Sequence, residues 1–192
     1  MEGNALDQAV IERCLVSPAD PRRVVDVIVT SIGCVAVFTA AKVGFEDVHV
    51  CEKGMNTLLA ALASVRKSGA VGRPRVIAFS SAGLSKFTRD VPLLMLPVYR
   101  TLVRIPHKDK RAMEHILCAS GEDWVLIRPS HLVDGETDKA IRVGVEDPEK
   151  GVESTAIGYT ISREDVGKWI FENFLAAQNG EKYTGKAVAL TY

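Results

Sequence analysis

The chain has 192 residues, of which 47% are hydrophobic and 25% charged, and its 24 basic side chains balance 24 acidic ones. This length suits one domain with a full hydrophobic core, residues 1–192, and is too short for two of ordinary size. The zero net charge argues against a protein that binds nucleic acid, because such proteins usually carry a basic excess.

The N-terminal sequence MEGNALDQAV lacks the basic and then apolar pattern of a signal peptide. Within Val27–Ala41 the uncharged run is about 15 residues, shorter than the roughly 20 that a membrane-spanning helix needs. We interpret this run as a buried strand followed by a loop or helix start, and expect a cytoplasmic protein with no membrane partner. The four cysteines have no metal-ligand spacing, so we expect reduced, mostly buried thiols and no metal site.

The first part of the chain alternates helical and strand patterns. Asn4–Leu15 places apolar residues at helical spacing. Val24–Ser31 is nearly all apolar and β-branched, which predicts a strand buried on both faces of a parallel sheet. After a variable loop, Val48–Ser68 again has helical periodicity, and Val76–Ser80 predicts the next strand.

The later part continues this alternation. Val91–Arg104 is apolar but interrupted by prolines, and we interpret it as a lid or a cover over the edge of the sheet. The remaining predicted elements are a helix over Lys108–Ser120, a strand over Trp124–Arg128, a turn over PSHLVDG, short strands within Ile141–Ile161, a helix over Ser162–Leu175 capped by Ser162, and a strand over Lys186–Tyr192. Strands alternating with helices predict the α/β class, with a Rossmann-like parallel sheet flanked by helices.

Four separated segments together resemble one protein family. They are DVIVTSIG (Asp26–Gly33), VIAFSSAG (Val76–Gly83), the pair HKDKRAMEHIL and DWVLIRPSHLVDG (within His107–Gly135), and YTISREDVG (Tyr159–Gly167). In this order and spacing they resemble the atypical short-chain dehydrogenase/reductases, specifically the NAD(P)-binding group around NmrA-like proteins and flavin (biliverdin) reductase B. The resemblance implies an oxidoreductase with NADP or NAD as cofactor.

The family's first βαβ unit, with its G-x-x-G-x-x-G turn, has no counterpart in this sequence. Those glycines let the backbone approach the cofactor's pyrophosphate at a helix N-terminus. The same unit would cover one side of Val24–Ser31, and a bare apolar strand edge favours pairing with another chain. We therefore expect an N-terminally truncated form, or an edge covered by a homodimer or by rearrangement.

The resemblance assigns catalytic roles to Ser81 and Lys110. Ser81 matches the serine that ends the central strand beside the nicotinamide, where its hydroxyl would orient a substrate carbonyl, and Ser80 is its neighbour on the cofactor side. The alternative is a strand-terminal serine bonded to the local backbone. Lys110 matches the lysine that contacts the nicotinamide ribose, and the alternative is a solvated lysine paired with Glu114.

Further cofactor contacts follow from the same resemblance. The turn Pro129, Ser130 and His131 matches the nicotinamide side of the crevice, and Gly33 matches the residue beside the adenosine. For His131 the alternative is a loop histidine with a local hydrogen bond. For Gly33 it is a glycine required by turn geometry.

The usual proton donor of short-chain enzymes is missing, since Pro106 occupies the tyrosine's place. Tyr99 and His107 are the nearby side chains that qualify as a substitute donor or as substrate contacts. The alternatives are packing in the apolar cover for Tyr99 and a solvated position for His107.

Basic residues cluster in the same region, opposed only by Asp109: they are Arg100, Arg104, Lys108, Lys110 and Arg111. Such a cluster is either a solvated face or an attraction for an anionic ligand, such as a 2′-phosphate, a carboxylate or a phenolate.

These residues favour an NAD(P)H-dependent reductase that acts on a small carbonyl or conjugated substrate. A non-redox, NmrA-like protein that senses a nucleotide or binds a partner is the alternative, as is a cofactor-independent isomerase or cyclase on the same scaffold. Fold class alone does not choose among them.

Overall fold

The computed structural model describes residues 2–38, 43–176 and 179–192, so the end of the Val27–Ala41 segment lies outside the described residues. The chain divides into two compact units, Met1–Ile77 with Lys108–Asp123 and Ala78–His107 with Trp124–Tyr192. Strand β4 (Arg75–Phe79) and helix α4 (Arg104–Cys118) each have residues in both units. A single domain over residues 1–192 stays a prediction.

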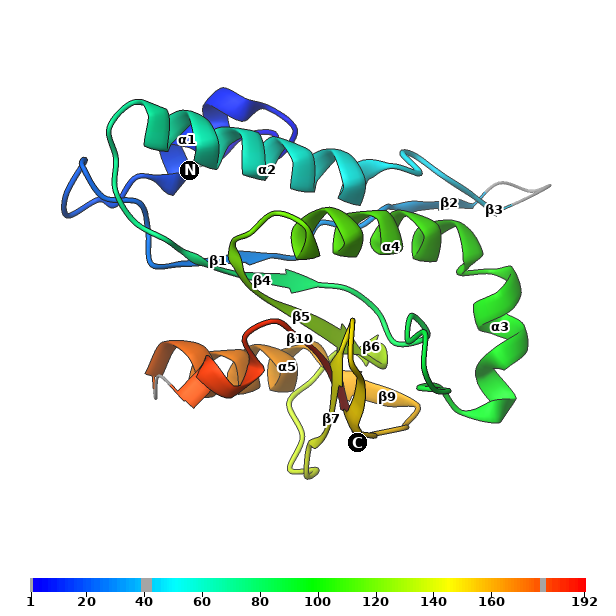
Figure 1. The fold of residues 1–192 in the computed structure, drawn as a ribbon. Helices are drawn as coiled ribbons and strands as arrows, with labels where there is room; N and C mark the ends of the chain where they lie inside the picture. Colours follow the sequence, from blue (N-terminus) through cyan, green and yellow to red (C-terminus); the bar gives the residue numbers. More distant parts are fainter. Residues whose placement is uncertain (1, 39–42, 177–178) are drawn as a thin grey trace. The chain divides into compact units, whose positions relative to one another are not determined.

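In the first unit, α1 (Gln8–Leu15) packs beside α2 (Val50–Lys67), as Figure 1 shows. The predicted helix over Asn4–Leu15 begins later because Asp7 caps it, accepting the backbone N–H of Ala9 at 2.9 Å. The prediction of a helix over Val48–Ser68 is confirmed by α2.

Strand β1 (Val27–Thr30) pairs with β4 and is the last strand of its sheet in the described residues. The expectation of burial on both faces is wrong, since Val29 keeps 48% of its surface exposed. An end strand has a neighbour on one side only, so its apolar side chains are less well covered. The predicted variable loop contains an antiparallel pair, β2 (Ala36–Phe38) and β3 (Val43–Phe45).

Helix α2 is capped by a side chain from α4. Asp109 is 2% exposed, and its carboxylate accepts the backbone N–H groups of Cys51 at 2.8 Å and of Glu52 at 2.9 Å. The local N-cap, His49, makes no capping hydrogen bond with its side chain. Asp109 therefore satisfies two amide groups at the start of α2 and places a negative charge at the positive end of the helix.

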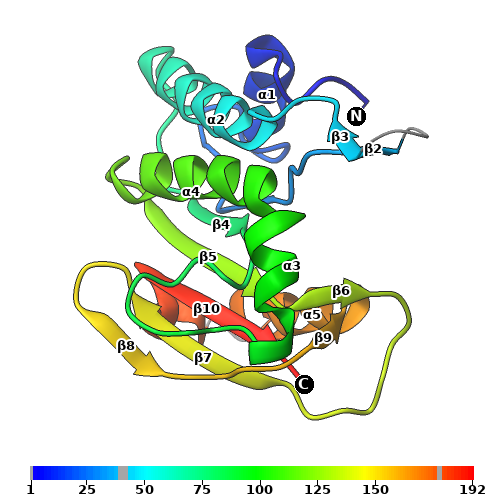
Figure 2. The same cartoon turned by 90° about the vertical axis from the view of Figure 1, so that its right-hand side faces the viewer.

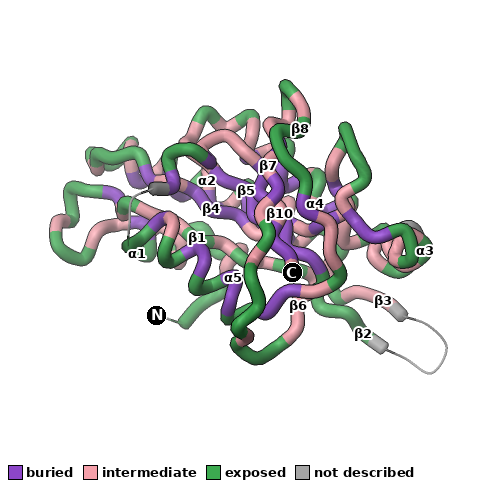
Figure 3. The backbone as a smooth tube through the Cα atoms, turned by 90° about the horizontal axis from the view of Figure 1, so that it is seen from below, coloured by how far each residue is buried: buried purple, intermediate pink, exposed green. Residues whose placement is uncertain are grey.

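The second unit is built on a mixed sheet, in which the end of β4 is followed by β5 (Asp123–Pro129), β10 (Lys186–Thr191), β7 (Arg142–Asp147) and β8 (Gly151–Ser154). Strands β5 and β10 are parallel, whereas β7 runs antiparallel to β10 and to β8 (Figure 2). The α/β class is confirmed, and the antiparallel strands make the sheet mixed. Figure 3 shows β5 and β10 as mostly buried backbone.

The other elements of the second unit correct one sequence interpretation. The predicted turn PSHLVDG contains a strand, β6 (His131–Val133), which pairs in parallel with β9 (Thr160–Ser162). The apolar segment before α4 forms the short helices η1 (Leu93–Met95) and α3 (Leu96–Thr101). The C-terminal helical region comprises α5 (Arg163–Ile170), the π-helix η2 (Phe171–Ala176) and η3 (Asn179–Tyr183). Ser162 caps α5 as predicted, accepting the Asp165 N–H at 3.1 Å.

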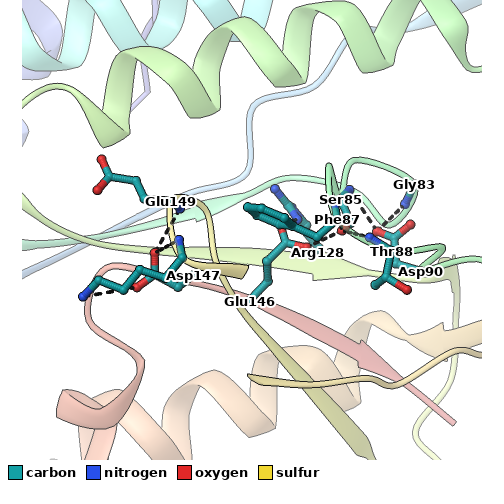
Figure 4. A network of polar contacts seen from close by, with 10 residues as sticks. Gly83, Ser85, Phe87, Thr88, Asp90, Arg128, Glu146, Asp147 and Glu149 are labelled. Carbon is teal, nitrogen blue, oxygen red and sulfur yellow. Dashed lines mark hydrogen bonds and ion pairs between the residues drawn. The ribbon is translucent and has the colours of Figure 1, made fainter. Parts of the chain in front are cut away.

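A buried ion pair links two strands of this sheet to the loop after β4 (Figure 4). Arg128 on β5 and Glu146 on β7 are 5% and 7% exposed, and Arg128 Nη1 lies 2.8 Å from Glu146 Oε1. The other carboxylate oxygen of Glu146 accepts the hydroxyl hydrogen of Ser85. The network holds the loop against the sheet. Moving the loop away would take a hydrogen-bond partner from the buried Glu146 carboxylate, and a buried charge that loses a partner is strongly destabilising.

Among the described residues, none of the helices combines the length and apolar character needed to span a membrane. The expectation of mostly buried cysteines is only partly met. Cys51 is buried, and burial raises the pKa of its thiol to about 12, whereas Cys34 and Cys118 are half-buried and Cys14 is exposed.

We predict that Asp109→Ala lowers the free energy of unfolding by about 1–3 kcal/mol, because it leaves the buried amide of Cys51 and the part-buried amide of Glu52 without their acceptor. Urea denaturation measures the loss, and Asp138→Ala, at an exposed aspartate, is the control. Equal stability of Asp109→Ala and the control would show that the cap contributes nothing.

Asp147 provides a test at acid pH. Its hydrogen bond from Lys186, 2.8 Å long, and the backbone N–H of Glu149 lower the pKa of Asp147 to about 2. A carboxyl whose pKa is lower in the folded state adds stability above its unfolded pKa, and this stability is lost as the pH falls through the folded pKa.

We therefore expect Asp147→Asn to be less stable than the wild type at neutral pH, and the difference to vanish as the pH falls from about 4 to about 2. Thermal unfolding at a series of pH values measures it. A difference that does not change with pH would contradict the assignment.

Candidate functional site

A pocket of about 240 Å³ in the second unit collects most of the predicted site residues. Its lining residues come from the ends of β4 and β5, from β6, from α3 and from the starts of α4 and α5: they are Ser80, Ser81, Met95, Val98, Tyr99, Val103, His107, Pro129, Ser130, His131, Leu132 and Arg163. One wall is apolar, the floor carries serine hydroxyls, and the lining contains no carboxylate. The pocket lies where strand ends meet, as ligand sites of open α/β sheets do.

Backbone hydrogen bonds fix the serine pair of the floor. The N–H of Ser80 donates to the carbonyl of Ile127 at 2.7 Å, and the N–H of Ala82 donates to the carbonyl of Pro129 at 3.0 Å. Between them, the Ser81 hydroxyl donates to the carbonyl of Ala82 at 3.0 Å. This last bond is the local alternative considered for Ser81, and the structure adds a second contact to it.

The second contact of Ser81 is with His107, whose Nε2 lies 3.1 Å from the serine Oγ. His107 is half-buried in the first turns of α4, with its ring 5.3 Å from the ring of Tyr99 in an edge-to-face arrangement. The alternative of a solvated His107 is therefore wrong. The reason is the approach of a loop distant in sequence, which covers the imidazole.

Gly83 allows this close packing. Its φ is +89°, and a Cβ at this position would lie 2.6 Å from Cδ1 of Tyr99 and 2.9 Å from Cε1 of His107. Asp90 holds the turn, since its carboxylate accepts the N–H of Gly83 at 2.9 Å and that of Ser85 at 3.3 Å. Sequence reasoning assigned no role to either residue, although a glycine after a strand is the usual signal of a positive φ.

Tyr99 lines the pocket with its aromatic ring and also packs edge-to-face against the ring of His107. Burial, and to a lesser extent the charge of Asp90, raise the pKa of its phenol. The phenol therefore stays protonated at neutral pH and gives up its proton less readily than an exposed tyrosine.

The turn after β5 is held by two backbone bonds. The Ser130 N–H donates to the carbonyl of Leu190 at 3.0 Å and the His131 N–H to that of Tyr159 at 3.2 Å. The Ser130 hydroxyl donates to Thr191 Oγ1 at 2.9 Å, whereas the His131 ring is exposed. Sequence reasoning missed Arg163, the first residue of α5, which lines the pocket and pairs with Asp134 at 2.5 Å.

Lys110 and Gly33, also predicted for the site, lie in the first unit. Lys110 is half-buried and donates from Nζ to the carbonyl of Ile32 at 2.6 Å, so it holds the segment that leads to Gly33. This bond is a structural alternative to a cofactor contact. Gly33 is exposed, and a Cβ there would meet nothing within 4 Å. The cofactor roles of both residues stay predictions.

The basic cluster is divided by the structure. Arg104, Lys108 and Arg111 are exposed, as on a solvated face. The Asp109 carboxylate is not paired with these basic side chains, because it is buried against the first turn of α2 and accepts two backbone N–H groups there. The same carboxylate lies within 4.8 Å of ligand atoms of His49 and Glu52, but its oxygens already accept two amide hydrogens, and we assign no metal there.

The pocket of the second unit has donor groups that suit a nicotinamide. The hydroxyls of Ser80 and Ser81 border its space of about 240 Å³. The lining carries no carboxylate that would repel the cofactor's phosphates. No glycine-rich turn occurs in the sequence, so the described chain supplies no cradle of that kind for the pyrophosphate.

Comparison with protein families identifies one match, to a family described as NAD(P)H-binding, over residues 4–176. Among curated proteins, reductase pytE of Aspergillus terreus is 33% identical over 207 aligned positions, which cover 100% of this chain and 76% of that protein. Oxidase pynE of Aspergillus niger is 28% identical, covering 98% of this chain and 77% of that protein.

Solved structures agree on the fold. A short-chain dehydrogenase/reductase (wide type) from Veillonella parvula, in complex with NADP, superposes with a TM-score of 0.70 at 16% identity, over 100% of this chain and 71% of that chain. A putative NADH-flavin reductase from Streptococcus pneumoniae gives a TM-score of 0.56 at 16% identity, over 86% of this chain and 70% of that chain. The identities are low, so the likeness establishes a Rossmann-like α/β fold.

The Gly83 contact yields a prediction. Gly83→Ala adds a methyl group against two rings at a positive φ, and we expect it to lower the free energy of unfolding by about 1–3 kcal/mol more than Gly135→Ala. Gly135 is the matched control, because its φ is +94° and a Cβ there meets nothing within 4 Å. Denaturation in urea measures both, and equal losses would show that the ring contacts are easily displaced.

Proposed function

The chain belongs to the NAD(P)H-binding family of short-chain dehydrogenase/reductase-like oxidoreductases, and on this basis we propose that it is an NAD(P)H-dependent reductase acting on a small carbonyl or conjugated compound. The observation that carries the proposal is the pocket in which Ser80, Ser81 and the turn at Pro129 meet the imidazole of His107. Two relatives described as a reductase and an oxidase support redox chemistry.

A bound NAD(P)H would supply the hydride, and the residues of the chain would bind and orient the acceptor. The Ser81 hydroxyl would turn from the carbonyl of Ala82 to donate to the substrate carbonyl, and so stabilise the negative charge that develops on that oxygen. Ser80 and His131 border the expected nicotinamide position.

The apolar wall selects the shape of the substrate. Met95, Val98 and Val103 come from η1, α3 and the segment that follows, and they face the pocket together with Tyr99 and Leu132. A flat, largely apolar compound with one hydrogen-bond acceptor matches this combination of wall and floor. In this proposal the segment predicted as a lid forms the substrate wall.

We expect NADPH or NADH to bind the purified chain with a dissociation constant near the micromolar range, measured by calorimetry and by the fluorescence of Trp124 and Trp169. Ser81→Ala should retain this binding and lower kcat/KM for p-nitrobenzaldehyde by about 100-fold, because it removes one donor to the developing oxyanion.

Ser68→Ala, at an exposed serine at the end of α2, is the control and should match the wild type. If neither nucleotide binds, the chain is not a working reductase, and the non-redox and cofactor-independent functions take precedence. If Ser81→Ala turns over at the wild-type rate, the role of the hydroxyl is wrong.

A further inference from the structure

If Lys110 is matched to the lysine of the short-chain enzymes, as the resemblance implies, Pro106 stands where their proton-donating tyrosine would be. A carbonyl reduction needs a proton as well as a hydride, so another group must deliver it. We propose that His107 is the proton donor of this pocket and that Ser81 relays its proton to the substrate oxygen. This inference rests on the proposed function.

The hydrogen bonds of Ser81 set the direction of the relay. A serine hydroxyl has one hydrogen and can donate one hydrogen bond. In the structure Ser81 gives this hydrogen to the carbonyl of Ala82, at 3.0 Å. In the imidazolium both ring nitrogens are donors, so in that form the contact of 3.1 Å runs from His107 Nε2–H to the serine oxygen. His107 is then the donor and Ser81 the acceptor.

Each proton in the reaction has a source and a destination. A bound NAD(P)H would supply the hydride that adds to the carbonyl carbon, and would be left as NAD(P)+. The carbonyl oxygen takes the hydroxyl proton of Ser81, and the serine oxygen takes the Nε2 proton of the His107 imidazolium. The imidazole is left neutral and regains a proton from water. The product is an alcohol, and Ser81 is unchanged.

The packing around His107 favours this role over a purely structural one. The turn at Gly83 presses against the imidazole at Cε1, and the ring of Tyr99 borders it from α3, so the ring has little freedom to rotate away from Ser81. A proton donor held within hydrogen-bond distance of its acceptor requires this kind of restraint.

The charges near His107 come from several elements. Asp90 lies behind Gly83, while Arg163 and His131 line the same pocket, and Tyr99 is an ionisable neighbour whose raised pKa keeps it neutral. An imidazole titrates near neutral pH without help from its surroundings.

The first test needs no cofactor. Nuclear magnetic resonance of the imidazole nitrogens, in the whole chain without nucleotide, should show that His107 titrates between about pH 5 and pH 8. The neutral form should carry its hydrogen on Nε2, and Ser81→Ala should alter the Nε2 signal more than the Nδ1 signal. An imidazole that stays neutral throughout this range overturns the proposal.

The second test uses NADPH and p-nitrobenzaldehyde. His107→Gln should bind NADPH as the wild type does and lower kcat/KM by between about 100- and 10,000-fold. In the wild type kcat/KM should fall as the pH rises through the pKa of His107, and in His107→Gln this fall should be absent. His115→Gln, an exposed histidine on the same helix, is the control and should behave as the wild type.

Tyr99→Phe distinguishes the other possible donor, because it keeps the ring and removes the hydroxyl. The wild-type pH profile should persist in Tyr99→Phe. If the profile is lost there and kept in His107→Gln, the donor is Tyr99 and the proposal is wrong. A wild type that binds no nucleotide refutes the proposed function itself, whereas NADPH binding with a pH profile unaffected by His107→Gln refutes the donor role alone.

Discussion

The geometry of the pocket depends on one close contact, that of the Gly83 backbone with the rings of Tyr99 and His107. A side chain at this position would occupy the space of both rings, and the positive φ of the turn disfavours any residue with a Cβ. Asp90 stabilises the turn from one side, and the network of Ser85, Glu146 and Arg128 anchors the continuing loop to the sheet. These contacts hold the loop where Ser81 lies within hydrogen-bond distance of His107.

The sequence predicted helices and strands well where their formation depends on residues close together in the chain. The apolar run of β4, the periodicity of α2 and the Ser162 cap of α5 all depend on neighbours within a few residues, and each has its expected place. Strand β6 was missed because its pairing partner, β9, is distant in the sequence. Its three residues, His131–Val133, are also too few to show the alternation of apolar and polar side chains that indicates a strand. The exposure of β1 also depends on whether a further strand pairs with its free edge, which the residues of β1 themselves do not specify.

Sequence reasoning predicted which residues line the candidate site better than it predicted the contacts between them. The resemblance identified Ser81 and the Pro129–His131 turn, Tyr99 and His107 were named as nearby substitutes for the missing tyrosine, and all of these residues line one pocket. The hydrogen bond between Ser81 and His107 joins residues 26 positions apart, so no spacing rule signals it. The same holds for Asp109, which looks like a counter-charge in a basic cluster and is a buried helix cap. Arg163 lines the pocket at the start of α5, directly after β9, and no motif in the sequence indicated this position.

The cap on α2 has a consequence for the order of folding. Asp109 lies 58 residues beyond Cys51, whose amide it accepts, so a growing chain exposes all of α2 before the residue that caps it. Isolated helices are marginal in water, and an uncapped first turn weakens them further. Until α4 has been synthesised and has docked, α2 lacks two of the hydrogen bonds that define its start. The first unit therefore completes itself only when its distant second segment arrives, and synthesis of residues 1–77 alone leaves it unfinished.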